Sequence, residues 1–262
     1  MKFKDCFVPP KITSRFLHVW QRNFLHYRKT WMVSLLWTCL EPLMYLGAIG
    51  YGLGSYVSNM GGHSYVEFFF PGILTSTAMM VAFFEGTYGC FAKLNFQKTY
   101  ATIMMSPVSA EEIVVGEILW TASKGLFGAC GVALVASFLG LVDSWRIFPV
   151  LLILFGVSWF FAGLAMIVTT WVRNYDAFIY YISGFIIPMS LVSGIYFPIE
   201  QLPNGIRHLT WLLPLTHAVS AVRGVLSVGF TWQAFAHVAL ILFIGWLCMN
   251  IAIWRVRNKL VR

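Results

Sequence analysis

Four ionisable residues interrupt stretches of otherwise apolar sequence, and they carry the strongest chemical signal in the chain. Glu41 precedes Pro42 in the first stretch, and Glu85 lies toward the end of the second. Glu117 and Lys124 lie seven residues apart in the third stretch, two turns apart on one face of a helix. A charge at the centre of a membrane-spanning helix costs about 2.5–3.5 kcal/mol, so such groups face protein or water and pair with each other. We therefore predict an ion pair between Lys124 and either Glu41 or Glu85.

Two interpretations of Glu41, Glu85 and Lys124 remain open from the sequence. In the first, they line a polar path for the head group of an amphiphilic cargo. In the second, they form a structural ion pair that fixes the packing of the helices. Glu117 fits the structural role better.

Motifs for catalysis are missing from the sequence. The chain has no G-x-x-x-x-G-K-[ST] phosphate loop, so we expect it not to hydrolyse ATP itself. It has no H-E-x-x-H or G-x-S-x-G motif, and its His and Cys residues show no metal-ligand spacing. We predict that the chain is not an enzyme and holds no metal or cofactor of its own.

The composition identifies the class of protein that must position these charges. Of 262 residues, 59% are hydrophobic and only 11% are charged, with a mean hydropathy of +0.75. Soluble domains carry about 25% charged residues, so a soluble protein is excluded. The net charge of +8 does not indicate nucleic-acid binding, because no basic stretch is separable from an apolar one. The composition predicts an all-α polytopic membrane protein that forms one transmembrane domain over residues 1–262.

Six apolar runs are each long enough to cross a bilayer, which needs about 20 residues per helix. They cover residues 31–57, 67–92, 113–140, 147–172, 177–199 and 230–254. Most Lys and Arg residues lie before the first run, after the last, and in the loops after the second and fourth. This distribution predicts that both termini are cytoplasmic. We expect no cleavable signal peptide, because the first run starts only near Trp31 and is too long for one.

Residues 11–30 precede the first span and have an amphipathic pattern. Phe16, Trp20 and Phe24 recur every four residues, while Arg15 and Arg22 lie largely on other faces. The pattern predicts a helix lying in the cytoplasmic membrane interface. The alternative is a basic flank that only sets the topology.

The longest cytoplasmic loop, residues 93–108, contains a predicted short helix at 97–104. Pro107 ends that helix, and Ser109 with Glu112 forms a capping box that opens the next span. A short rigid helix on this side could contact a partner protein. An ordinary connector explains the pattern equally well.

Residues 198–229 are too polar to form a simple span and too apolar for a plain exterior loop. Pro198, Pro203 and Pro214 interrupt the segment, while Leu209 and Trp211 need burial. A re-entrant helical hairpin near the outer surface satisfies both demands, since broken backbone is tolerated inside protein or along a cavity. The alternative is an amphipathic loop lying on lipid.

Several sequence blocks together resemble permeases of the ABC-transporter type-2 exporter family. Within that family they resemble most the nodulation-type lipooligosaccharide exporter permeases. The resemblance covers nearly the whole chain and rests on the order and spacing of the blocks. These are WQRNFL at 20–25, GEILW at 116–120, YDAFIY at 175–180, SGIYFPIEQLP at 193–203 and LPLTH at 213–217.

The resemblance implies six spans in a bacterial inner membrane, a second permease copy and membrane lipid as surroundings. It implies two copies of a separate cytoplasmic ATPase that binds ATP and Mg, and it makes the helix near 98–107 a coupling helix. The ATPase-coupling residues would be Lys98, Tyr100, Ala101, Met104, Ser106 and Pro107. The outer-gate residues would be Phe197, Pro198, Leu202, Pro203, Pro214 and His217. The family shares no fixed substrate motif, so the resemblance names no cargo.

Three classes of function are compatible with these residues, and the resemblance favours the first. The first is the permease of an ATP-driven exporter for an amphiphile such as a lipid-linked oligosaccharide. The second is an ATP-independent, proton-coupled transporter or flippase that uses Glu41, Glu85 and Lys124 as a relay. Against it, the sequence lacks the paired interrupted helices of inverted repeats. The third is a scaffold or membrane-enzyme subunit that transports nothing.

Overall fold

The computed structural model describes residues 13–54, 56–57, 64–142 and 145–260. Within these ranges the secondary structure is helical and contains no strand. Five helices there are long and apolar enough to cross a membrane, or six if one bent pair is counted as a span. The all-α membrane architecture predicted from composition is confirmed.

The five spans lie close to five of the predicted apolar runs. Helix α2 (Tyr65–Phe84) continues through two π-helical segments, η3 (Glu85–Gly89) and η4 (Ala92–Phe96), as one 32-residue span. The next spans are α4 (Ala110–Phe138) and α5 (Ile147–Trp171). The fifth predicted run is the segmented span Tyr175–Val192, and the last is α10 (Trp232–Leu260). The segmented span consists of η5 (Tyr175–Ala177), α6 (Phe178–Tyr181), η6 (Ile182–Ile186) and α7 (Ile187–Val192).

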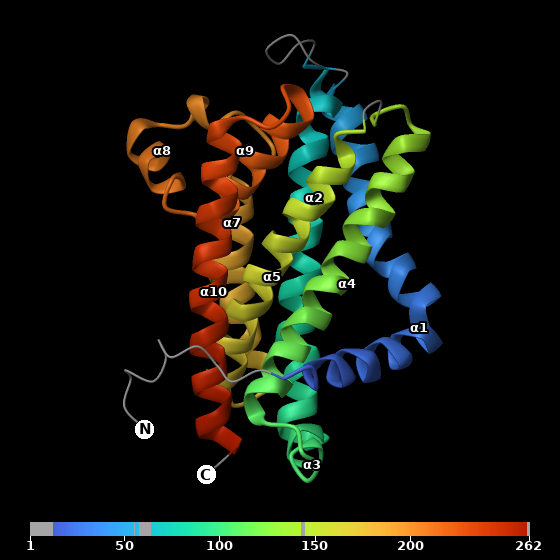
Figure 1. Ribbon diagram of the computed structural model, residues 1–262. Helices are drawn as coiled ribbons and strands as arrows, with labels where there is room; N and C mark the ends of the chain where they lie inside the picture. The colour runs from blue at the N-terminus through green and yellow to red at the C-terminus, as the bar shows by residue number, and fades with distance from the viewer. Residues whose placement is uncertain (1–12, 55, 58–63, 143–144, 261–262) are drawn as a thin grey trace.

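The first predicted span and the amphipathic segment before it form one continuous helix. Helix α1 runs over Phe16–Tyr45 and continues as the π-helical segment η2 (Leu46–Leu53). Figure 1 shows that α1 is bent, with its first part lying crosswise to the bundle and its second part rising along it. Residues 11 and 12 of the predicted interfacial helix lie outside the described residues.

The crosswise part of α1 is held against the start of α4. The Thr13 amide donates to the Glu112 carboxylate at 3.1 Å, and Trp20 Nε1 donates to Ser123 Oγ at 3.1 Å. A Cβ on Gly116 would lie 2.6 Å from the Phe16 carbonyl oxygen, so only glycine permits this approach. Glu112 also closes the predicted capping box with Ser109, which is confirmed.

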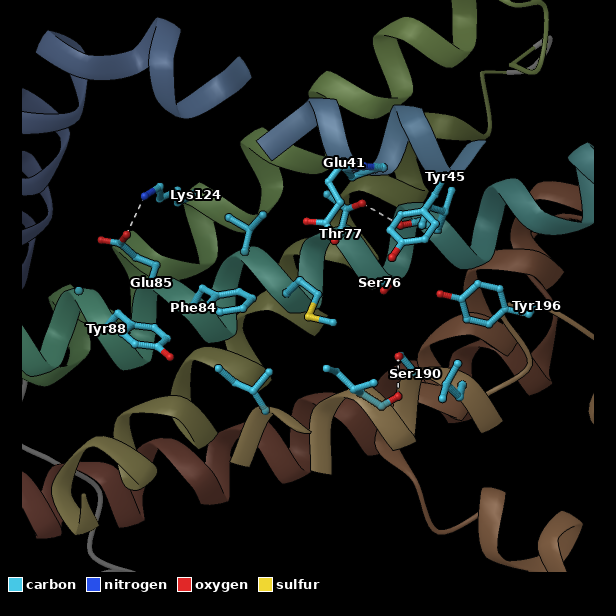
Figure 2. Close-up of a pocket in the computed structure, with 18 residues that line it drawn as sticks. Glu41, Tyr45, Ser76, Thr77, Phe84, Glu85, Tyr88, Lys124, Ser190 and Tyr196 are labelled. Carbon is cyan, nitrogen blue, oxygen red and sulfur yellow. Dashed lines mark hydrogen bonds and ion pairs between the residues drawn. The ribbon is translucent and has the colours of Figure 1, made fainter. Parts of the chain in front are cut away.

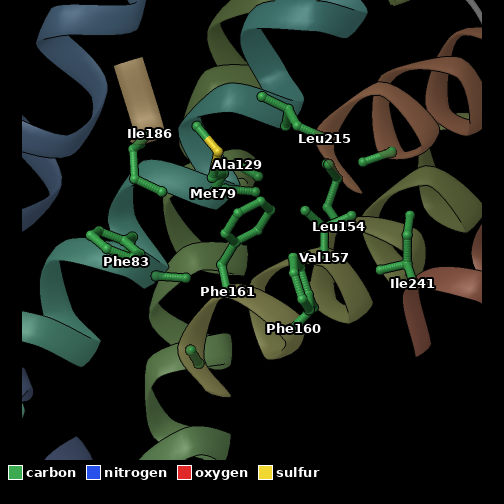
Figure 3. Packing of buried hydrophobic residues seen from close by; sticks show 14 of the residues in the cluster. Met79, Phe83, Ala129, Leu154, Val157, Phe160, Phe161, Ile186, Leu215 and Ile241 are labelled. Carbon is green, nitrogen blue, oxygen red and sulfur yellow. The ribbon is translucent and has the colours of Figure 1, made fainter. Parts of the chain in front are cut away.

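The core lies where α2, α4, α5, α9 and α10 meet (Figure 3). Phe83, Leu154 and Phe161 are almost fully buried there. Small residues bring the helices close, as expected inside a membrane where packing replaces the hydrophobic effect. A Cβ on Gly125 would lie 2.9 Å from the Ala78 carbonyl oxygen, and one on Gly86 would lie 2.7 Å from the Ala165 Cβ.

Residues 198–229 form a short turn and two helices. These are η7 (Ile199–Gln201), α8 (Asn204–Thr210) and α9 (Pro214–Ser227), and α8 and α9 meet at 83°. In Figure 1 they lie at the end of the bundle opposite α3 (Thr99–Ile103), the start of α1 and the end of α10. The bent pair agrees with either a broken span or a re-entrant hairpin.

Candidate functional site

A groove of about 670 Å³ runs along one face of the bundle, between α1, α2 with η3, and the segmented span α6–α7 (Figure 2). Along α2 its lining extends from Ile73 to Gly89, about 24 Å at the helical rise. That length is most of the roughly 30 Å hydrocarbon thickness of a bilayer. The groove therefore extends through most, but not all, of the hydrocarbon layer.

The lining mixes polar and apolar groups along its length. Figure 2 places Glu85 and Lys124 at one end and Tyr196 at the other, with Ser76 and Thr77 between them. The Thr77 hydroxyl donates to the backbone carbonyl of its own helix at 2.8 Å, which satisfies its donor without a second helix. Such a lining suits an amphiphile better than a wholly polar or wholly apolar solute.

Glu85 and Lys124 form the ion pair expected from the sequence. The Lys124 ammonium donates to the Glu85 carboxylate at 2.6 Å, and Trp120 Nε1 donates to its other oxygen at 3.2 Å. Both charged side chains are mostly buried, with 22% and 16% of their surfaces exposed. Glu85 is also the first residue of η3, and π-helical turns occur frequently at functional sites.

Glu41 does not pair with Lys124. Its side chain is exposed and lines the groove (Figure 2), and the structure gives it no ion pair among the described residues. Of the two partners predicted for Lys124, the structure selects Glu85. The Glu41 carboxylate is left facing the groove.

A second ion pair lies next to the first, and the sequence analysis missed it. Lys93 Nζ lies 2.7 Å from one oxygen of Glu117, which is fully buried, and 3.9 Å from Glu85. Arg22, from the crosswise part of α1, lies 3.9 Å from the other Glu117 oxygen. Lys93 was assigned to a loop, but η3 and η4 carry the helix past it. The only sequence signal was the spacing of Glu85 and Lys93, two turns apart on one helix.

The short helix α3 places the six residues expected at an ATPase contact in two groups. Tyr100 is fully buried and Met104 is partly buried against a small cluster that includes Val19 and Ile113. Burial raises the pKa of the Tyr100 hydroxyl well above its ordinary value. Exposed side chains on this segment belong to Lys98, Ala101, Ser106 and Pro107, and Met105 is 88% exposed. Four of the six residues are thus accessible to a partner, whereas Tyr100 and Met104 pack against the protein itself.

The predicted outer-gate residues lie around the α8–α9 pair. Phe197, Pro198 and Leu202 are partly buried before α8, Pro203 is exposed, and Pro214 begins α9.

His217 on α9 makes two contacts within this outer pair. Its Nε2 lies 2.8 Å from the Trp211 carbonyl oxygen, and its Nδ1 lies 2.9 Å from Nδ1 of His237 on α10. Because a carbonyl only accepts, His217 Nε2 carries a proton, and His237 then donates to His217 in the neutral pair. His237, which the sequence analysis did not select, connects the α8–α9 pair to α10 through this contact.

Arg223 on α9 also fixes this end of the molecule, and nothing in its sequence context indicated the role. Its guanidinium donates to the carbonyl oxygens of Gly194 at 2.8 Å and Phe68 at 3.2 Å. It stacks 4.0 Å from the centre of the Phe68 ring. Gly194 has a positive φ of 78°, so the turn that presents its carbonyl favours glycine.

Within the described residues, no group of three or more His, Cys, Asp or Glu side chains is arranged to hold a metal ion. The site can therefore be described through its ion pairs and its groove.

Residues 14–227 match the family described as ABC-2 type transporter. This chain belongs to the ABC-2 type transporter family.

Several curated proteins are similar to this ABC-2 transporter over most of their length. It is 36% identical to nodulation protein J of Rhizobium meliloti (strain 1021) over 208 residues, 79% of each chain. It is 32% identical to nodulation protein J of Bradyrhizobium diazoefficiens over 244 residues, 93% of each chain. It is 23% identical to the inner membrane transport permease YadH of Escherichia coli (strain K12), over 78% of this chain and 80% of that one. The chain is a multi-pass membrane transport permease.

Proposed function

We propose that this permease is the membrane-spanning subunit of an ATP-driven exporter that moves an amphiphile from the cytoplasmic side of the bacterial inner membrane outward. A lipid-linked oligosaccharide or a lipid has the required chemistry. The groove carries this proposal, because it extends through most of the hydrocarbon layer, mixes polar and apolar lining, and ends in charged groups at the α3 side of the bundle. The relative named inner membrane transport permease supports transport and the inner membrane as the location, and the names of the relatives specify no cargo.

The second permease copy is proposed to cover the groove. The segmented span beside it has only 22% of its apolar window buried within the chain. Ile179 and Tyr180 are 57% and 77% exposed on it. Glu41 lies on the same face, and an unpaired carboxylate facing lipid is costly. A homodimer that joins two such faces would enclose the two grooves as one path and remove Glu41 from lipid.

The energy source is proposed to be a pair of cytoplasmic ATPase subunits that bind ATP and Mg. The support is the exposed surface of the α3 segment, in which Ala101, Met105 and Pro107 are exposed and Tyr100 is buried against the rest of the protein. Both termini lie on the cytoplasmic side in this proposal. ATP-driven closure of the partners would push α3, and the motion would reach the groove through η4, which ends next to α3, and then through η3 and α2.

Isolation of the tagged chain from its native membranes in a mild detergent tests this proposal. We expect a stoichiometric partner with an ATPase phosphate loop, and we expect Met105→Glu to abolish its recovery. Lys259→Gln, a charge change near the end of α10, is the control and should leave recovery unchanged. Recovery of an intact permease without any ATPase would overturn the exporter and favour the proton-coupled transporter.

A further inference from the structure

A second cavity, of about 660 Å³, lies under the crosswise part of α1. Its walls come from α1, from η3 and η4, and from α4. Five of its lining residues are basic: Arg22, His26, Lys29, Lys93 and Lys124. We call it the basic cavity.

Positive charge in the basic cavity exceeds the negative charge that could neutralise it. Lys93 and Lys124 are neutralised by Glu117 and Glu85, at 2.7 and 2.6 Å. Arg22 reaches Glu117 only at 3.9 Å, and Lys29 has no ion pair with any described residue. Arg22 and Lys29 thus leave an excess of positive charge in a cavity that also has aromatic walls. Such a cavity favours the binding of an anion.

The basic cavity adjoins the groove. Glu85, Gly89 and Lys124 line both hollows, so the Glu85–Lys124 pair stands at their junction. Gly89 packs closely against the Glu85 side chain at this junction, because a Cβ there would lie 3.1 Å from the Glu85 carboxyl carbon. A ligand in the basic cavity would need only to displace or pass this ion pair to enter the groove.

We infer that the basic cavity is the intake site for the anionic group, a phosphate or sulfate ester, of an amphiphile in the cytoplasmic leaflet. Arg22 supplies a planar donor pair suited to such a group, and Lys29 supplies a mobile point charge. Tyr27 and Trp120 offer apolar surface beside them for the rest of the molecule. The direction of movement rests on the proposed export function, whereas binding at the cavity does not.

Lipid retention by the purified full-length chain tests this inference. The chain is stripped of lipid in detergent and titrated with dioleoylphosphatidylglycerol or dioleoylphosphatidylcholine, and bound lipid is counted by native mass spectrometry. We expect the anionic lipid to bind more tightly. Lys29→Gln and Arg22→Gln should each weaken it about fivefold, the effect of one basic residue near a membrane surface.

The matched control is Arg28→Gln, which removes the same charge from the neighbouring, exposed position of α1 outside the cavity lining. It should leave affinity unchanged. Equal binding of both lipids, or an equal loss of affinity in Arg28→Gln and Lys29→Gln, would overturn the inference. These cations would then serve only to set the membrane topology. Lys29→Gln keeps the test valid if Arg22→Gln fails to fold, because Lys29 is exposed.

A soluble phosphate ester distinguishes the source of the anion. Glycerol 3-phosphate should compete only weakly with phosphatidylglycerol, because it lacks the apolar part that the cavity walls would contact. Competition at the same concentration as the lipid would overturn the assignment to an amphiphile. No ATPase is present in this assay, so a missing ATPase partner would refute the export proposal without altering this result.

Discussion

Replacing Lys124 by Met separates the two roles that its ion pair with Glu85 could have. The substitution keeps most of the side-chain volume but leaves the Glu85 carboxylate with the Trp120 hydrogen bond at 3.2 Å and Lys93 at 3.9 Å. Breaking a buried pair by removing one partner costs about 3–5 kcal/mol. Lys93 remains close and both side chains keep some exposure, so we expect a smaller loss of about 2–3 kcal/mol, at or just below the lower limit of that range.

The double variant Glu85→Gln/Lys124→Met removes both charges and should recover most of that stability, since replacing a buried pair by neutral groups is often nearly neutral. Thermal unfolding in detergent measures the stability of the single and double variants. ATP-driven export from proteoliposomes then measures function in the variants that fold. We expect the double variant to fold like the original chain and to export at least tenfold more slowly.

Two results would refute this reasoning. Normal export by the double variant would show that the pair only fixes helix packing. A double variant as unstable as Lys124→Met would show that the single variant fails for a reason other than an unpaired Glu85. Glu111→Gln is a matched control, because it breaks the more exposed 2.8 Å pair with Arg257 away from the groove, and it should change stability by less than about 1 kcal/mol.

Three further predictions follow from the packing and the two ends of the molecule. Gly125→Ala should destabilise the chain by about 1–3 kcal/mol in thermal unfolding, because its Cβ would lie 2.9 Å from the backbone oxygen of Ala78. Gly184→Ala, with open space at its Cβ, is the control. Equal losses of stability in the two variants would contradict close packing at Gly125. Arg223→Met should raise the rate of amide hydrogen exchange at the Gly194 turn without unfolding the bundle, because it removes the hydrogen bonds from Arg223 to the Gly194 and Phe68 carbonyl oxygens. An unchanged exchange rate would show that these contacts do not hold the turn. His237→Phe should increase the rate of proteolysis near Trp211, because His217 loses its hydrogen-bond partner on α10. A cleavage rate equal to that of the original chain would show that the His217–His237 contact does not stabilise this region.

Five of the six predicted spans match candidate spans among the described residues, because they are long apolar runs, whereas the first predicted run, 31–57, is not one of those candidates. The predicted run 147–172 and the helix Ile147–Trp171 differ by one residue at one end. The capping box at Ser109 fixed the start of α4 for the same kind of local reason. Such features depend on neighbouring residues, which a sequence displays directly.

The parts of the site that were missed depend on contacts between distant segments. Lys93 could not be assigned to an ion pair, because π-helical turns extend α2 past its last apolar stretch and turn Lys93 toward Glu117. Tyr100 looked like a surface residue of a short helix, but its burial depends on Val19 and Ile113 from two other helices. Pairing of Lys124 with Glu85 rather than Glu41 likewise depends on where the bent α1 crosses the bundle.

Chemical blocking of the groove during export tests the central claim most directly. In a chain whose five native cysteines are replaced, Tyr45→Cys places a thiol in the groove and Leu134→Cys places one on an exposed part of α4 outside it. Both proteins are joined with their ATPase in proteoliposomes and treated with a bulky maleimide before ATP is added. We expect the label at residue 45 to stop export of the amphiphile and the label at residue 134 to leave it unchanged. Export that continues with residue 45 fully labelled would contradict the groove as the path.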